Sequence, residues 1–255
     1  MRSIYVLCVL LFAFCFMTLI GGKANANGTS ECPGKKERVR IFIHYPLPKD
    51  HERTPGSSET PCPDTCAVTT NATVSDYGLT GWHLPLGGVG YYVNVSSVPS
   101  AVGSTNALTA INTAFSTWTT ASPTKIFTYK GTTGIKGAKR DGKNVIAWRG
   151  ISGSAIGVTY IWYYPSTGQL VEVDTIFNKN FKWTFTPYLT DCGGVCGTFD
   201  VQNIATHEFG HWVGLDDLYN INDEDLTMYG YGDKSELKKD TLGTGDTVGA
   251  TVVSP

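Results

Sequence analysis

The sequence predicts an α+β domain, because a long helix, a run of strands and a second long helix follow one another along the chain. The first helix is predicted over 104–118, where apolar residues recur at steps of three and four. Segments between 126 and 178 are rich in β-branched and aromatic residues, which favours strands. The second helix is predicted to begin near Asp200 and to reach Val213. A run of strands set between helices is typical of the α+β class.

Each predicted element has its own local signal. Ser104 and Asp200 are suitable N-caps for the two long helices. A strand over 89–95 is predicted ahead of the first helix. The remaining strands are predicted over 126–129, 144–148, 156–163 and 170–178, with an edge extension over 182–185. A last helix is predicted within 241–252, although three glycines weaken it.

Length and composition limit the class of protein. The chain has 255 residues, of which 41% are hydrophobic and 16% charged, with a formal net charge of −2. These values indicate one globular domain, or one domain with a small extra segment. The near balance of charge gives no indication of binding to nucleic acid or to an anionic membrane surface.

The N-terminus has the pattern of a secretory signal. Residues 1–26 combine Arg2, an apolar stretch over 4–20 and the small-residue sequence Ala24-Asn25-Ala26. An uncleaved membrane anchor is the alternative, but the apolar stretch is at the short end for a membrane span. We therefore expect a secreted, extracellular protein with no stable membrane insertion after the signal is cleaved.

Residues 27–76 are predicted to be a propeptide or an N-terminal extension. They are rich in Pro, Ser and Thr, which argues against a separate core, and only the apolar run 39–43 is a candidate strand. Of the seven cysteines, two lie in the signal, and an odd number therefore remains in an exported protein. Their pairing stays open, and a four-cysteine zinc site is the less favoured alternative. The remaining cysteines are Cys32, Cys62, Cys66, Cys192 and Cys196.

The second long helix contains the pattern His-Glu-x-x-His. His207 and His211 are four residues apart, so they lie on one helical face and can bind one metal ion. Glu208 is placed to accept a proton from a metal-bound water. Gly214 can adopt a left-handed conformation that ends the helix and turns the chain. That turn would bring Asp217 toward the metal as a third ligand.

With Met228 downstream, the segment from His207 to Asp217 resembles the metzincin clan of zinc endopeptidases. The sequences Phe209-Gly210-His211 and Met228-Tyr229 are most similar to its matrixin branch. The resemblance implies a catalytic domain over 77–255, with a twisted, mostly parallel five-stranded sheet, two long helices and a small irregular C-terminal subdomain.

The resemblance also implies roles for individual residues. Zinc would be bound by His207, His211 and Asp217, where Asp217 replaces the histidine of most metzincins. Gly214 and Met228 would have structural roles, Met228 as an apolar floor beneath the histidines. No tyrosine ligand is assigned, because the position at which two other branches have one is Gly230 here.

This ligand set predicts a peptidase. Two imidazoles and a carboxylate leave one zinc position for a water, whose pKa zinc lowers to roughly 7. Glu208 would take the proton of that water and pass it to the leaving amine. The expected partners are protein or peptide substrates, and the expected state is a monomer.

Several alternatives remain open. In one alternative the protein is a thermolysin-like protease, whose third zinc ligand would be Glu224 or Glu236. In another it is an exported zinc-binding protein without catalytic activity. A cysteine of the N-terminal segment could block the zinc, although a disulfide-stapled loop is favoured there. The resemblance also implies a structural Ca²⁺ ion. The sequence contains no dedicated calcium-binding loop, so we favour the interpretation that the candidate acidic residues are solvated loop side chains. The candidate calcium ligands are Asp141, Asp174 and Asp191.

Overall fold

The computed structural model describes residues 36–48, 74–186 and 197–254, which belong to one compact unit spanning Gly34–Pro255. The predicted signal peptide, Asp191 and all of the cysteines lie outside the described residues, so the predictions that rest on them stay predictions.

The main sheet has seven strands in the order β11-β1-β6-β7-β5-β3-β4. Most neighbours run parallel, and only the pairs β1–β6 and β6–β7 are antiparallel. The α+β class and the mostly parallel sheet are thus confirmed, whereas the predicted number of five strands is wrong. The strands are β1 (Arg38–Pro46), β3 (Val89–Val93), β4 (Phe127–Thr132), β5 (Asn144–Arg149), β6 (Gly157–Tyr163), β7 (Leu170–Asn178) and β11 (Tyr231–Gly232).

The two additional strands come from segments that the sequence interpretation did not place in the sheet. β1 belongs to the predicted extension 27–76, although the candidate strand over 39–43 is confirmed. β11 lies in the polar, glycine-rich region after the second long helix. Two small sheets complete the strands, β2 (Gly78–Leu79) with β10 (Leu215–Asp216) and β8 (Trp183–Thr184) with β9 (Phe199–Asp200).

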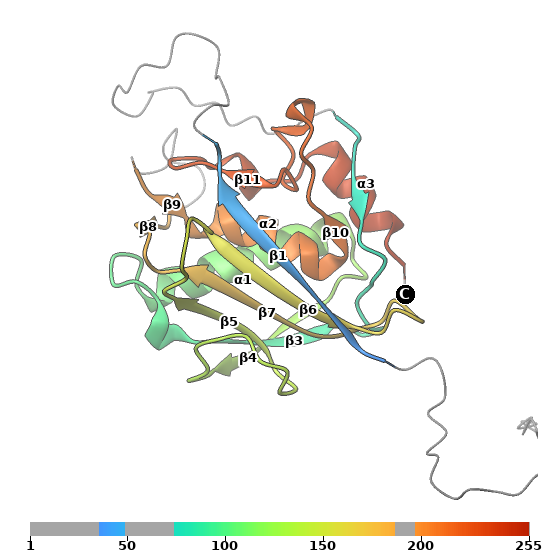
Figure 1. Cartoon of the computed structure of the whole chain (residues 1–255), viewed down its shortest axis with the longest axis horizontal. Coiled ribbons are helices and arrows are strands. Elements are labelled where there is room, and N and C mark those ends of the chain that lie inside the picture. The colour runs from blue at the N-terminus through green and yellow to red at the C-terminus, as the bar shows by residue number, and fades with distance from the viewer. Residues whose placement is uncertain (1–35, 49–73, 187–196, 255) are drawn as a thin grey trace, which may run out of the picture. The chain divides into compact units, whose positions relative to one another are not determined.

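Three α-helices are described, α1 (Ser104–Ala121), α2 (Val201–Val213) and α3 (Thr244–Val252). Helices α1 and α2 lie together on one face of the main sheet (Figure 1). The prediction that Asp200 caps α2 is confirmed, because its carboxylate accepts the backbone N–H groups of Gln202 and Asn203 at 2.8 and 3.2 Å. The predicted cap at Ser104 is wrong: Gly103 precedes α1, and the Ser104 hydroxyl donates to the Val95 carbonyl.

Helix α2 is buried along its whole length. The Trp118 indole of α1 donates to the Thr206 carbonyl at 2.8 Å, while Phe115 stacks on Phe209 with ring centroids 3.8 Å apart. On the sheet side, the Trp212 indole donates to a threonine hydroxyl of β7 at 2.9 Å. Contacts from two layers therefore fix the helix that carries the histidine pattern.

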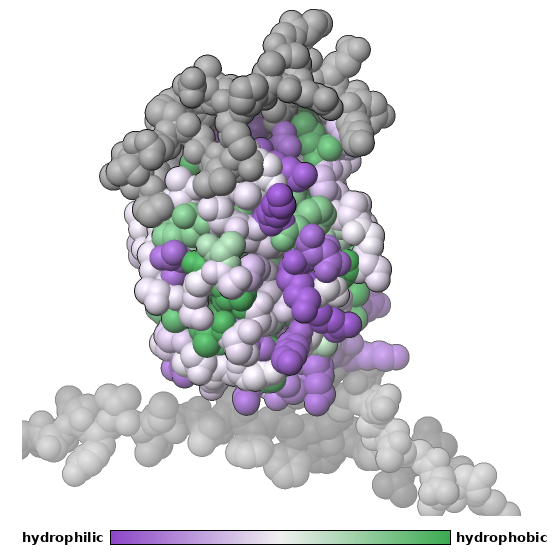
Figure 2. All heavy atoms as spheres, turned by 90° about the vertical axis from the view of Figure 1, so that its left-hand side faces the viewer, coloured by the Kyte–Doolittle hydropathy of each residue, from purple (hydrophilic) through white to green (hydrophobic). Residues whose placement is uncertain are grey.

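The distribution of hydrophobic residues is that of a protein with an enclosed core. On the face shown in Figure 2, hydrophobic residues form small patches among neutral and hydrophilic ones, and a hydrophilic band runs along it. Most buried apolar side chains instead form one cluster between the sheet and its helices. None of the helices in the described ranges combines the length and apolar character needed to cross a membrane.

Candidate metal centre

Three potential metal ligands meet at the C-terminal end of α2. The Nε2 atoms of His207 and His211 lie 3.2 and 3.5 Å from Oδ1 of Asp217. A tetrahedral zinc ion with bonds of 2.0–2.1 Å separates its ligand atoms by about 3.3 Å. The spacing of these three atoms therefore suits one metal ion, and the group could hold one.

Gly214 brings the third member of this group into place. It ends α2 in the left-handed conformation, with φ 117° and ψ 19°, as the sequence predicts. A side chain at this position would also meet the backbone, because a Cβ would lie 2.5 Å from the Trp82 carbonyl oxygen. After the turn, β10 pairs with β2, and Asp217 follows directly. Both the backbone conformation and the available space thus require glycine.

Backbone carbonyls orient the two imidazoles. Nδ1 of His207 lies 2.8 Å from the Thr227 carbonyl, and Nδ1 of His211 lies 2.9 Å from the Leu215 carbonyl. Because a carbonyl only accepts, each Nδ1 carries the proton and each Nε2 keeps its lone pair toward Asp217. This is the tautomer that metal binding needs.

Protonation states in the centre also suit a metal. Burial lowers the pKa of His207 to about 4 and lowers the pKa of His211, which favours neutral imidazoles. Burial alone would raise the pKa of Asp217, but His211, His207 and the Tyr219 hydroxyl together lower it, which favours the carboxylate. A metal cation would stabilise this carboxylate in the place of a proton on either histidine. Within the described part of the chain, His207 Nε2 and Asp217 Oδ1 are buried without a hydrogen-bond partner. Buried polar atoms are rarely left so, and a bound cation would satisfy both.

The two neighbouring aspartates point to different partners. Asp217 Oδ2 accepts a hydrogen bond from the Tyr219 hydroxyl at 3.2 Å, which leaves Oδ1 facing the histidines. Asp216 instead accepts two hydrogen bonds from Arg40 at 2.8 and 2.9 Å. The sequence interpretation did not identify Tyr219 or Arg40, because neither belongs to the histidine pattern.

The two alternative glutamates are not members of this group. Among the described residues, Asp217 is the carboxylate that joins His207 and His211 in a metal-capable group. The Glu236 carboxylate accepts the backbone N–H of Asp233 at 3.0 Å. Glu224 follows the short 3-10 helix Ile221–Asp223.

Glu208 lies beside the three ligand atoms and is fully buried. Its Oε2 accepts a hydrogen bond from the Thr159 hydroxyl of β6 at 2.5 Å. Its Oε1 has no hydrogen-bond partner in the described ranges and lies 3.6 Å from His44 Nδ1. Burial raises the pKa of Glu208 to about 8. The Thr159 hydroxyl thus holds one oxygen in place, and burial favours the protonated acid near neutral pH. A metal cation in the neighbouring group would favour the carboxylate, whose Oε1 could then accept a proton.

Met228 packs directly against α2 and is buried. Its sulfur occupies the space that a side chain at position 210 would need, and a Cβ there would also lie 2.9 Å from Trp118 Cζ2. Glycine at position 210 therefore permits the close packing of this methionine against α2.

We expect Gly210→Ala to destabilise the protein. Overpacking costs typically about 1–3 kcal/mol, which would outweigh the roughly 1 kcal/mol that alanine contributes within a helix. Urea denaturation would measure the change in the free energy of unfolding. Gly134→Ala is the matched control, since position 134 is exposed and has open space around it. A Gly210→Ala protein as stable as wild type would contradict this packing.

Asp246 of α3 holds the turn that carries Met228. Its buried carboxylate accepts backbone N–H groups from Gly243, Thr227 and Met228 at 2.8–3.0 Å. The Thr227 carbonyl in turn accepts the Nδ1 proton of His207. Asp246 is therefore a positioning residue that acts through the turn.

Asp246→Ala should lower the free energy of unfolding by about 3 kcal/mol or more, because buried N–H groups without acceptors cost roughly 1–3 kcal/mol each. It should also weaken metal binding, since His207 loses its fixed acceptor. Asp225→Ala in the same region is the control, because its 3.4 Å contact with Lys238 is only partly buried and surface ion pairs contribute about 0–1 kcal/mol. Equal effects of the two substitutions, in thermal melting and in metal titration, would refute the role of Asp246.

The candidate calcium ligands have other partners. Asp174 is buried, so its assignment as a solvated loop acid is wrong, and its oxygens accept the N–H groups of Val145 and Lys139 at 2.8 and 2.9 Å. Asp141 accepts the N–H of Lys143 at 3.2 Å. Both carboxylates thus bond to backbone N–H groups.

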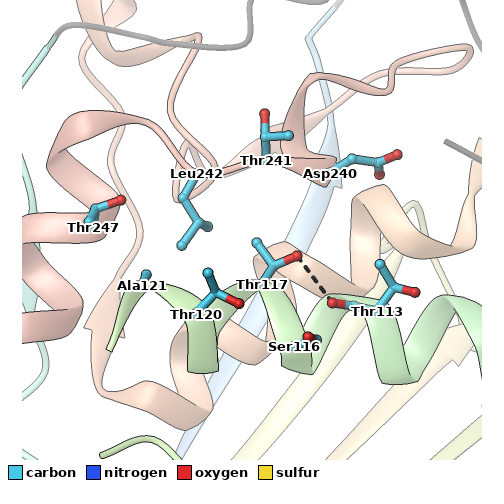
Figure 3. Close-up of a pocket in the computed structure, with 9 residues that line it drawn as sticks. All are labelled: Thr113, Ser116, Thr117, Thr120, Ala121, Asp240, Thr241, Leu242 and Thr247. Atoms are coloured by element: carbon cyan, nitrogen blue, oxygen red, sulfur yellow. Dashed lines mark hydrogen bonds between the residues drawn. The ribbon is translucent and has the colours of Figure 1, made fainter. Parts of the chain in front are cut away.

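A separate cavity of about 390 Å³ lies between α1 and the region before α3 (Figure 3). Small threonine and serine side chains of α1 form one wall, and Asp240, Thr241 and Leu242 form the other. The Asp240 carboxylate points away from the other lining residues (Figure 3). The cavity therefore offers a potential ligand little besides methyl and hydroxyl groups.

No model of a known protein family matches this chain, and no curated protein sequence matches it. The roles of the residues in the metal centre therefore rest on their geometry and chemistry.

Proposed function

We propose that the protein is a secreted zinc endopeptidase of the metzincin kind, similar to the matrixins. The observation that carries the proposal is the group formed by His207, His211 and Asp217, with Glu208 beside it. Three ligands leave one position of a tetrahedral zinc ion for a water, which is the arrangement of catalytic zinc sites.

The order of elements supports the same proposal. Strands β4, β3, β5, β7 and β6 form a mostly parallel set in which β6 alone is reversed. Helix α1 connects β3 to β4, and α2 follows the last of these strands in the chain. This is the order of one helix, several strands and a metal-binding helix that the resemblance implies, with Met228 in the irregular part that follows.

The chain's own groups can perform the proton transfers of peptide hydrolysis. Zinc bound by His207, His211 and Asp217 would polarise the scissile carbonyl and acidify the attacking water. The free Oε1 of Glu208 would accept the proton of that water and deliver it to the leaving amine. The Thr159 hydroxyl would hold the other oxygen of Glu208 in place during both steps.

The two alternative functions have less support. A thermolysin-like ligand set would need Glu224 or Glu236, yet Asp217 is the carboxylate beside the histidines. A binding protein without activity would have no use for a buried carboxylate whose oxygen faces the centre without a partner. Such a group is costly to bury, and its retention favours a catalytic role.

The test of this proposal is metal-dependent hydrolysis. The full-length, zinc-loaded protein should hydrolyse an unfolded protein substrate, lose that activity in excess chelator and regain it when zinc is restored. Metal content would be measured on the same samples. Hydrolysis that continues unchanged after all bound metal has been removed would contradict the proposal.

A further inference from the structure

Strand β1 lies along the candidate metal centre. It pairs antiparallel with β6, so that Phe42 is opposite Thr159 and His44 is opposite Gly157. On its other side it pairs in parallel with β11, where Tyr45 is opposite Tyr231. Figure 1 shows β1 in blue beside β6 in yellow. An extended peptide that binds a protein through a sheet edge makes the same kind of backbone pairing.

The inward side chains of β1 cover the centre. The Phe42 ring stacks on His211, and the His44 ring packs on His207, each with ring centroids 3.9 Å apart. His44 Nδ1 also lies 3.6 Å from Oε1 of Glu208. As a result, the side chains of His207 and Glu208 are 0% exposed and that of His211 is 1% exposed. A substrate carbonyl cannot reach these groups while β1 is in place.

Beyond its backbone pairing and its inward side chains, β1 is attached mainly through exposed groups. Its outward side chains Val39, Ile41, Ile43 and Tyr45 are all exposed. Arg40 is joined to Asp216, but the two side chains are 42% and 29% exposed. Such pairs contribute only about 0–1 kcal/mol. Another extended chain could replace the backbone pairing of β1 with β6 and β11.

We propose that residues 38–46 are a built-in inhibitory strand, which occupies the groove between β6 and β11 and places Phe42 and His44 over the catalytic groups. This inference rests on the proposed function, because it takes the groove as the place where substrate binds. It differs from inhibition by a cysteine that binds the zinc, because here the aromatic ring of Phe42 and the imidazole of His44 cover the catalytic groups. The form with β1 in the groove is latent, and hydrolysis requires its displacement.

Two double variants of the full-length chain, matched in chemistry, test this proposal. Phe42→Thr with His44→Thr removes the inward contacts, whereas Ile41→Thr with Ile43→Thr removes outward side chains. Threonine keeps the strand preference of the segment in both. Arg40→Glu is a third variant. It places a second negative charge beside Asp216, so that the two carboxylates repel each other, and it changes no buried side chain. Circular dichroism would verify that each variant is folded.

Two rates would be measured on the zinc-loaded proteins, hydrolysis of an unfolded protein and transfer of zinc to excess small chelator. Both rates scale with the fraction of molecules in which β1 has left the groove. In the Phe42→Thr, His44→Thr protein, the inward variant, we therefore expect both rates to rise by about tenfold or more. Arg40→Glu should change both rates in the same direction, and the outward variant should match wild type.

The two rates separate this proposal from the proposed function. Faster zinc transfer in the inward variant, without hydrolysis by any variant, would support β1 as the cover of the centre and contradict a peptidase. Equal transfer and hydrolysis rates in wild type and all three variants would overturn the inhibitory strand. Faster rates in the outward variant alone would overturn it as well.

Discussion

Glu208→Gln should keep its bound metal but lose at least about a hundredfold in peptide hydrolysis, the usual range for loss of a general acid–base group. The amide has nearly the same shape as the carboxylate, so the packing around α2 should not change. Its nitrogen cannot accept a proton, however, and its oxygen is a far weaker base. We place the metal at His207, His211 and Asp217 rather than at the second metal-capable group, which His44, His207 and Glu208 form, so metal content should stay the same.

The measurement should be made in wild type and in the Phe42→Thr, His44→Thr background, so that a covered centre does not hide the effect. Values of kcat/KM would be compared at equal zinc content. Glu236→Gln is the matched control, because it makes the same chemical change at a carboxylate that accepts the backbone N–H of Asp233 and does not lie beside the three ligand atoms. Near-normal turnover by a fully metal-loaded Glu208→Gln protein would exclude Glu208 as the base.

The helix that carries the histidines could be predicted from sequence because its signals are local. Asp200 accepts the free N–H groups of the first turn, and Gly214 takes the left-handed conformation that ends the last turn. The four-residue spacing of His207 and His211 then places them on one face. None of these signals depends on a residue that is distant in the sequence.

The position of β1 could not be predicted, because its partners are distant in the sequence and its pattern misleads. Apolar residues occupy positions 39, 41, 43 and 45, so a period of two predicts that this face is buried. The structure buries the opposite face through Phe42 and His44. Aromatic stacking on two potential metal ligands decides the orientation, and that partner surface exists only once α2 is folded.

Residues that support the centre were missed for a related reason. Thr159, Tyr219 and Asp246 are ordinary polar residues in their local sequence, and only the fold brings them to Glu208, Asp217 and the Met228 turn. Lys239 is a further case. It is fully buried, and its ammonium donates to the carbonyls of Tyr229 and Tyr231 at 2.5 and 2.7 Å. No periodic pattern or motif predicts such contacts.

Asp217→Ala should weaken zinc binding more than any other single carboxylate substitution near the centre. It removes one of three ligands, so the loss of affinity should exceed the roughly 10–100-fold typical of residues that only orient a ligand. Tyr219→Phe should fall within that smaller range, because the phenol only bonds to the second oxygen of Asp217. Competition with a chelator of known affinity would measure zinc dissociation constants for each variant.

The controls follow from the contacts of the neighbouring acids. Asp216→Ala should change zinc affinity little, since Asp216 bonds to Arg40 and to a backbone N–H rather than to the histidines. Glu224→Ala and Glu236→Ala should also leave it nearly unchanged. Asp217→His should still bind zinc, because a neutral imidazole is an equally suitable ligand. Unchanged affinity in Asp217→Ala together with loss in Glu224→Ala or Glu236→Ala would instead favour the thermolysin-like ligand set, with Asp217 close to the centre but outside the coordination of the metal.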